Sequence, residues 1–196
     1  IFMVLIGGII IDRLGTRKST LIFAVLCLTG AAFTAFQGDL TTMATGRLIF
    51  GLGAESLIVA VTTILARWFK GKELSFAFGI NLTIARLGSF AALNSPTWAK
   101  ALYNNWQYPM LIALVAGIIS VVAVIIYIGL DRKAEKIYTM RKIGDTDKVI
   151  FADIFKFNRS FWYITLLCVT FYSAVFPFQT FAVKFFIEVH GISREF

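Results

Sequence analysis

The sequence has very few of the residues from which catalytic and metal-binding sites are built. His190 is the only histidine, and the two cysteines, Cys27 and Cys168, lie far apart in apolar stretches. Two distant cysteines and one histidine support neither a disulfide framework nor a zinc site. A single histidine also makes a Ser-His-Asp triad very improbable. No P-loop or Rossmann fingerprint is present. We therefore expect no catalytic residue, no metal site and no cofactor, and we interpret the chain as a non-enzyme.

Charged residues are also scarce, at 15%, whereas hydrophobic residues reach 58% and the mean hydropathy is +0.79. Soluble proteins are only about 45–50% apolar. Apolar runs of about 20 residues, enough to cross ~30 Å of hydrocarbon, recur along the chain. They predict an all-α, multi-pass integral membrane protein with a cut helix at 1–11 and complete helices at 19–36, 41–67, 74–98, 105–130 and 160–187. Because the first run is cut, we expect a piece of a longer protein.

The net charge of +8 is compatible with nucleic-acid binding, but its distribution argues against that partner. Of the 19 basic residues, 14 fall on alternate connections, in clusters at 13–18, 67–72 and 132–159. Positive residues gather on the cytoplasmic side of membrane proteins. The charge therefore sets topology, and the lipid bilayer is the expected partner.

The segment 131–158 is the one clear boundary, because it is charged and mixed in sign. We expect an N-terminal helical half at 1–130, a cytosolic linker at 131–158 and the start of a C-terminal half at 159–196. Within the linker, residues 149–155 are predicted to form an amphipathic helix on the membrane surface.

A short charged turn separates the first two apolar runs, reading G-I-I-I-D-R-L-G-T-R-K over residues 8–18. We expect Gly8 to permit close helix approach and Gly15 to adopt a turn conformation that costs other residues energy. The spacing of Gly8, Asp12, Arg13, Gly15 and Arg17 resembles the loop between helices 2 and 3 of the major facilitator superfamily. In the 41–67 span, Arg47, Gly51 and Gly53 resemble the R-x-x-x-G-x-G pattern of helix 4 in that superfamily.

The resemblance implies a fold of two six-helix halves, of which this chain covers late helix 2 through helix 7. It also implies transport by alternating access, with the charged turn acting as a latch on the inner side. We expect Asp12 and Arg13 to gate, and Arg67 to pair with Asp12. The alternative is a charge cluster at the membrane border that only fixes topology. Arg47 either snorkels to the outer surface or joins the cavity.

Two charges lie at the middle of predicted spans, Glu55 in 41–67 and Arg86 in 74–98. Ionised groups at this depth cost about 2.5–3.5 kcal/mol each on insertion scales unless they are paired or face water. Glu55 suits an ammonium group and Arg86 suits a carboxylate, so together they favour a zwitterionic substrate. The alternative is a structural salt bridge between the two helices with no ligand.

Four segments, at 46–57, 68–74, 85–89 and 174–178, resemble the lysosomal dipeptide transporters of the superfamily and their bacterial and protist relatives. This resemblance implies that Glu55 and Arg86 clamp the termini of dipeptides, with uniport of many dipeptides. It also implies a bacterial cytoplasmic or lysosome-like membrane and, in a lysosome, a glycosylated accessory subunit. Proton coupling through Glu55 stays open.

The span 160–187 contains two further candidates. Pro177 is expected to break or kink the helix and to help gate the cavity. Tyr172 offers a hydroxyl to a peptide carbonyl, although aromatic side chains in such a span more often pack or face lipid. The competing functions are transport of a sugar, organic anion or drug, and a non-transporting membrane receptor or scaffold with the same fold.

Overall fold

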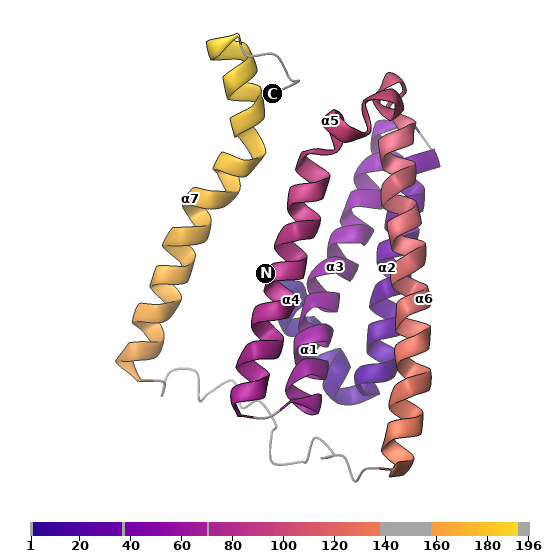
Figure 1. Ribbon diagram of the computed structural model, residues 1–196, viewed down its shortest axis with the longest axis vertical. Coiled ribbons are helices and arrows are strands. Elements are labelled where there is room, and N and C mark those ends of the chain that lie inside the picture. The colour runs from indigo at the N-terminus through magenta and orange to yellow at the C-terminus, as the bar shows by residue number, and fades with distance from the viewer. Residues whose placement is uncertain (1, 37, 70, 138–157, 192–196) are drawn as a thin grey trace. The chain divides into compact units, whose positions relative to one another are not determined.

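The computed structural model describes residues 2–36, 38–69, 71–137 and 158–191, which are helical almost throughout (Figure 1). The chain divides into two compact units, Ile1–Ile143 and Gly144–Phe196. The first holds α1 (Phe2–Leu14), α2 (Thr16–Phe36), α3 (Leu40–Trp68), α4 (Lys72–Leu93), α5 (Ser95–Trp98), the 3-10 helix η1 (Lys100–Asn104) and α6 (Gln107–Ile137). The second holds α7 (Arg159–His190).

The five complete membrane helices predicted from hydropathy are confirmed. In the described part of the chain, five helices are long and apolar enough to cross a bilayer: Thr16–Phe36, Leu40–Trp68, Lys72–Leu93, Gln107–Ile137 and Arg159–Ala182. Each corresponds to one predicted span. The all-α fold is therefore the fold that the apolar runs require.

The predicted span 74–98 is too long, because α4 ends at Leu93. Asn94 is its C-cap, and Pro96 lies in the first turn of the short helix α5. Proline cannot donate the backbone hydrogen bond that would continue α4, and its ring restricts the residue before it. Arg86 consequently lies about one helical turn past the midpoint of α4. Glu55 stays within one residue of the midpoint of α3.

The last predicted span of the first unit is too short, because α6 continues from Asp131 to Ile137. Those seven residues, assigned to the linker from their charge, form the last two turns of a helix. They include Ala134, Glu135 and Lys136, which are good helix formers. The amphipathic helix predicted at 149–155 lies outside the described residues.

The core of the first unit forms where α2 packs against α3 and α6 (Figure 1). Buried positions on α2 recur every three or four residues, as one packed helical face requires: Thr16, Ser19, Thr20, Phe23, Ala24, Cys27, Gly30, Ala31, Thr34 and Ala35. Glycines bring the backbones of α2 and α3 together. A Cβ at Gly30 would overlap the Phe50 nitrogen, and one at Gly53 would lie 2.8 Å from the Cys27 nitrogen.

The helix α7 of the second unit runs without interruption from Arg159 to His190, with Pro177 inside it. Pro177 therefore does not break the helix, and the other half of the prediction, a kink at Pro177, stays a prediction. Proline removes one intrahelical hydrogen bond, which frees the carbonyl of Ser173, but the two flanking helical segments are long enough to continue through it. Gly191 ends the helix with a left-handed conformation (φ +62°).

Candidate functional site

The charged turn between α1 and α2 has the conformation expected of it. Gly15 has φ +79°, and its N–H donates to the Ile11 carbonyl at 2.8 Å, so it ends α1. Within the described residues Gly8 makes no such close approach, because a Cβ there would meet no atom within 4 Å, and its expected role stays a prediction. Gly7 makes a close approach instead, since its Cβ would lie 3.0 Å from the Ser56 hydroxyl oxygen. The close approach of α1 and α3 thus uses the neighbouring glycine.

Four charged side chains meet at one end of the first unit: Arg17, Arg67, Asp131 and Glu135, here called the charge cluster. Arg17 donates through Nε to Asp131 Oδ2, and through Nη2 to Glu135 Oε2 at 2.7 Å. Its Nη2 also donates to the Asp131 carbonyl at 3.1 Å. Arg67 Nη1 lies 3.6 Å from Asp131 Oδ2, and Arg67 Nη2 lies 3.9 Å from Glu135 Oε1. The Asp131 side chain is completely buried.

The charge cluster joins the start of α2 to the ends of α3 and α6. The basic connections after α1, α3 and α6 therefore share one end of the unit, as alternate connections of a membrane bundle must. That this end is cytoplasmic stays a prediction from the charge distribution.

The expected pair between Asp12 and Arg67 does not form. Arg67 binds Asp131 and Glu135, and its Nη1 donates to the Thr16 hydroxyl at 3.3 Å. Asp12 and Arg13 are exposed, and neither has an ion pair within the residues that the structure describes. The acidic partners were missed because their charge assigned them to the linker. Asp131 and Glu135 are one helical turn apart and directly follow an apolar run, and this spacing indicates that they share one face of a continuing helix.

Glu55 lies on the side of α3 that faces away from α2. The residues of α3 that are buried, Gly46, Gly53, Ser56 and Ala60, form one stripe, and at about 100° per residue Glu55 points roughly opposite to it. Glu55 is exposed in this unit. Gly51 shares its face, and a Cβ there would meet nothing within 4 Å. Space beside Glu55 is therefore open along this face of α3.

Arg86 is also exposed, and it lies on the opposite side of α4 from Ala77, the buried residue of that helix. No ion pair joins Glu55 to Arg86 in the described part of the chain. Both side chains are thus without the mutual neutralisation that a structural salt bridge would supply.

Arg47 lies at the other end of α3 from the charge cluster. Its side chain is exposed, and Nη2 approaches Met110 Sδ of α6 at 3.6 Å. A thioether sulfur is a weak acceptor and cannot neutralise a guanidinium. The position of Arg47 fits the outer end of the helix that the sequence predicts for it.

Tyr172 belongs to α7 in the second unit, where its ring stacks on Phe176 with centroids 5.4 Å apart and planes 25° apart. Phe171 contacts the same ring edge-on at 5.5 Å. The hydroxyl of Tyr172 has no hydrogen bond within the described segments. The contact of Tyr172 with substrate stays a prediction.

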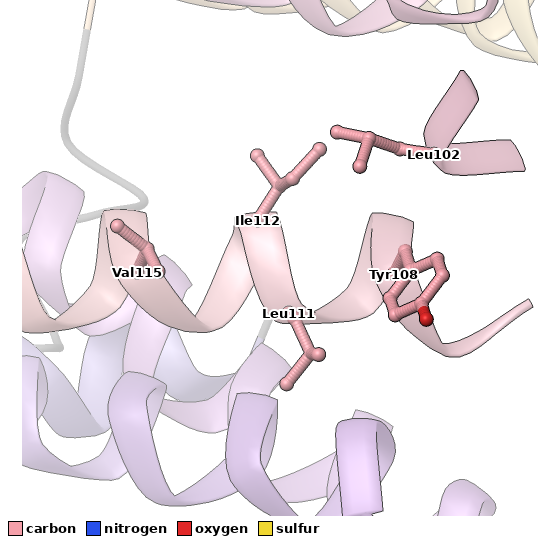
Figure 2. A pocket seen from close by; sticks show the side chains of 5 residues that line it. All are labelled: Leu102, Tyr108, Leu111, Ile112 and Val115. Carbon is pink, nitrogen blue, oxygen red and sulfur yellow. The ribbon is translucent and has the colours of Figure 1, made fainter. Parts of the chain in front are cut away.

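A shallow pocket of about 270 Å³ opens on α6 and η1, lined by Leu102, Tyr108, Leu111, Ile112 and Val115 (Figure 2). Its lining contains no charged side chain. In Figure 2, Leu102 approaches from η1 while the other four project from α6. A site for a charged solute needs oppositely charged groups, so this pocket does not suit a zwitterion.

The comparison with family models matches the Major Facilitator Superfamily over residues 1–196. The chain belongs to the major facilitator superfamily. Among curated relatives, the lysosomal dipeptide transporter MFSD1 of Danio rerio is 36% identical over 96% of this chain and 44% of its own length. The human protein of that name is 35% identical over 96% of this chain and 43% of its own. The hexuronate transporter of Escherichia coli is 25% identical over 96% of this chain and 46% of its own length.

This superfamily chain spans less than half the length of the curated relatives that it matches. No solved structure matches it. The family and the apolar helices make the protein an integral, multi-pass membrane protein. The family and its transporter-named relatives also make it a non-enzyme.

Proposed function

We propose that this protein transports dipeptides or similar zwitterions across a membrane by alternating access. The observation that carries the proposal is the 35–36% identity, over 96% of the chain, to proteins named lysosomal dipeptide transporters. It covers the segments that contain both Glu55 and Arg86. The compartment is a lysosome-like membrane or a bacterial cytoplasmic membrane, and in a lysosome a glycosylated accessory subunit accompanies the transporter.

Glu55 and Arg86 are the proposed substrate-binding residues, with Tyr172 as a third contact. Both charges lie within membrane helices, and neither has an ion-pair partner in the described ranges. An ionised group inside the bilayer is costly unless it is paired or hydrated. A water-accessible cavity removes that cost for both, and a zwitterion then satisfies both at once, its ammonium on Glu55 and its carboxylate in the fork of Arg86.

The absence of a Glu55–Arg86 ion pair also supports binding over the structural alternative. A purely structural bridge would hold the two side chains within salt-bridge distance of each other, and the described helices α3 and α4 do not. A receptor or scaffold with this fold would have no need for two unneutralised charges at this depth.

The experiment that tests the proposal uses the full-length protein in proteoliposomes. Uptake of one radiolabelled dipeptide is compared with uptake of its N-acetylated and C-amidated forms. Each modification removes one terminal charge, so each should lower uptake at least tenfold. Protein-free liposomes correct for leakage. Equal uptake of all three compounds would contradict the zwitterion clamp.

A second candidate is transport of a sugar acid, supported by the 25% identity to a protein named hexuronate transporter. Arg86 would again bind the carboxylate. Glu55, however, would then repel the anion instead of binding it. Competition by unlabelled glucuronate against dipeptide uptake separates the two, since a dipeptide site with an acidic side chain should discriminate against the sugar acid.

The remaining candidates are proposed to act in the conformational change. Asp12 and Arg13 are exposed beside the glycine-ended turn, where they are available to the other half of the protein. Gly15, Arg17 and Arg67 belong to the same end of the unit, Gly8 to the middle of α1, Arg47 and Gly51 to α3, and Pro177 to α7. Pro177 would act by removing one backbone hydrogen bond of α7, so that the helix bends more easily at that position.

A further inference from the structure

The charge cluster is built entirely within one half of the fold. Arg17 comes from α2, Arg67 from the end of α3, and Asp131 and Glu135 from the end of α6, all inside the unit Ile1–Ile143. Two cations meet two anions, so the cluster is neutral.

Asp131 is the centre of this cluster. Its carboxylate is completely buried, while Arg17 is 25% and Glu135 47% exposed. Both arginines approach the same Oδ2 atom, and Arg17 also binds the Asp131 backbone carbonyl. Opening the cluster would leave a buried carboxylate without a cation, which is much more costly than separating an exposed pair.

Asp131 is also part of a larger polar contact. Its second oxygen, Oδ1, and the hydroxyl of Tyr127, one turn earlier on α6, are both buried and have no hydrogen-bond partner within the described residues. Thr16 is 4% exposed and accepts a hydrogen bond from Arg67. The end of α6 is therefore held by the two arginines of the charge cluster, while the Tyr127 hydroxyl and Asp131 Oδ1 contribute no hydrogen bond in the described part of the chain.

From this geometry we infer that Asp131 is a positioning residue, and that the charge cluster stays closed during transport. Asp131 holds Arg17 and Arg67 against α6, and it thereby fixes the place of the turn that carries Asp12 and Arg13. Asp12 and Arg13 make and lose contacts with the other half of the protein during the cycle. Arg17 and Arg67 keep their contacts with α6 and form a fixed clamp. The inference rests on the proposed transport function, and it separates two groups of residues that the sequence places in one gate.

A permanent clamp and a gate predict different kinetics. A gating contact is made in one conformation only, so its loss changes the populations of the inward-open and outward-open states. A substrate then shows a higher apparent KM at one face of the membrane and a lower one at the other. Loss of a permanent clamp misplaces the gate in every state. It slows the cycle without favouring either face.

The test measures maximal rate and KM at both faces of the membrane, with the full-length protein in proteoliposomes and a labelled dipeptide. We expect Asp131→Asn to lower the maximal rate at least fivefold and to leave both KM values within twofold of the wild type. Asp12→Asn serves as the comparison and should shift the two KM values in opposite directions. Opposite shifts in Asp131→Asn would overturn the inference.

Arg17→Lys provides a milder variant in case Asp131→Asn folds poorly. Lysine keeps the charge but cannot bind both carboxylates with the planar fork of arginine. It should lower the maximal rate by more than twofold with both KM values unchanged. A wild-type rate, or opposite KM shifts, would count against the clamp.

Thermal unfolding of the detergent-solubilised protein needs no substrate, so it judges the clamp even if no dipeptide is transported. Asp131→Asn should lower the unfolding temperature more than Glu135→Gln, whose side chain is half exposed. Adding Arg17→Gln to Asp131→Asn should restore part of the loss, because no charge is then left unpaired. An unchanged unfolding temperature in Asp131→Asn would also contradict the inference.

Discussion

At the scale of single residues, the glycines of α3 show how differently two neighbouring positions are used. A Cβ at Gly53 would lie 2.8 Å from the backbone nitrogen of Cys27, whereas a Cβ at Gly51 would meet nothing within 4 Å. Backbone cannot move aside as a flexible side chain can. Gly53 is therefore required for the contact between α2 and α3, and Gly51 is not.

Gly53→Ala should lower the free energy of unfolding by about 1–3 kcal/mol, as overpacking of a closely packed site does. Gly51→Ala is the matched control, because it makes the same change two residues away. It should leave stability unchanged or raise it by up to ~1 kcal/mol, since alanine is the better helix former. Thermal unfolding of the two purified variants provides the comparison, and equal stabilities would refute the assignment of Gly53.

The two intramembrane charges lead to a second prediction at this scale. Arg86→Lys should lower dipeptide uptake at least tenfold, because a point charge cannot reproduce the bidentate fork on a carboxylate. Its unfolding temperature should stay within a few degrees of the wild type, since Arg86 has no ion pair in the described helices. Uptake is measured in proteoliposomes at equal protein content. Wild-type uptake by this variant would exclude Arg86 from the site.

Some residue-level contacts could not be predicted from the sequence. Hydropathy places Glu55 and Arg86 inside the bilayer, but the partners of Arg67 depend on where α6 ends and which face it presents. The linker-like charge of 131–158 obscured both. Gly7 and Gly8 are equally able to permit close approach, and only the rotation of α1 against α3 decides between them.

At the scale of elements, the turn between α1 and α2 depends on one backbone conformation. Gly15 has φ +79°, a region that costs residues with a side chain roughly 1–2 kcal/mol. Gly15→Ala should therefore lower the free energy of unfolding by about 1 kcal/mol. Gly15→Asn should lose less, because asparagine tolerates this region better. Measured unfolding temperatures should rank wild type, Asn and Ala in that order, and a different order would argue against a strained turn.

Helix positions follow from apolar length, whereas helix ends follow from local chemistry. All five spans were predicted because ~20 apolar residues have few alternatives to crossing a bilayer. The ends differed where a single feature outweighed hydropathy. Pro96 stopped α4 early, and the pairing of Asp131 with the two arginines accompanies the longer α6.

At the scale of the whole molecule, the first unit combines a tightly packed core with two exposed charges well inside its membrane helices. The α2–α3–α6 contact is held by close glycine approaches and by the charge cluster at one end. Glu55 and Arg86 lie on faces that this core does not use. Alternating access needs both features, a half that moves as one body and a binding face that the core leaves free.

The most direct measurement combines a change in the ligand with a change in the protein. The KM of a dipeptide and of its N-acetylated form is determined for the wild type and for Glu55→Gln. If Glu55 binds the ammonium group, acetylation should raise the KM at least tenfold in the wild type and no more than twofold in the variant. The same loss in both proteins would show that the ammonium does not bind Glu55, and it would contradict the account.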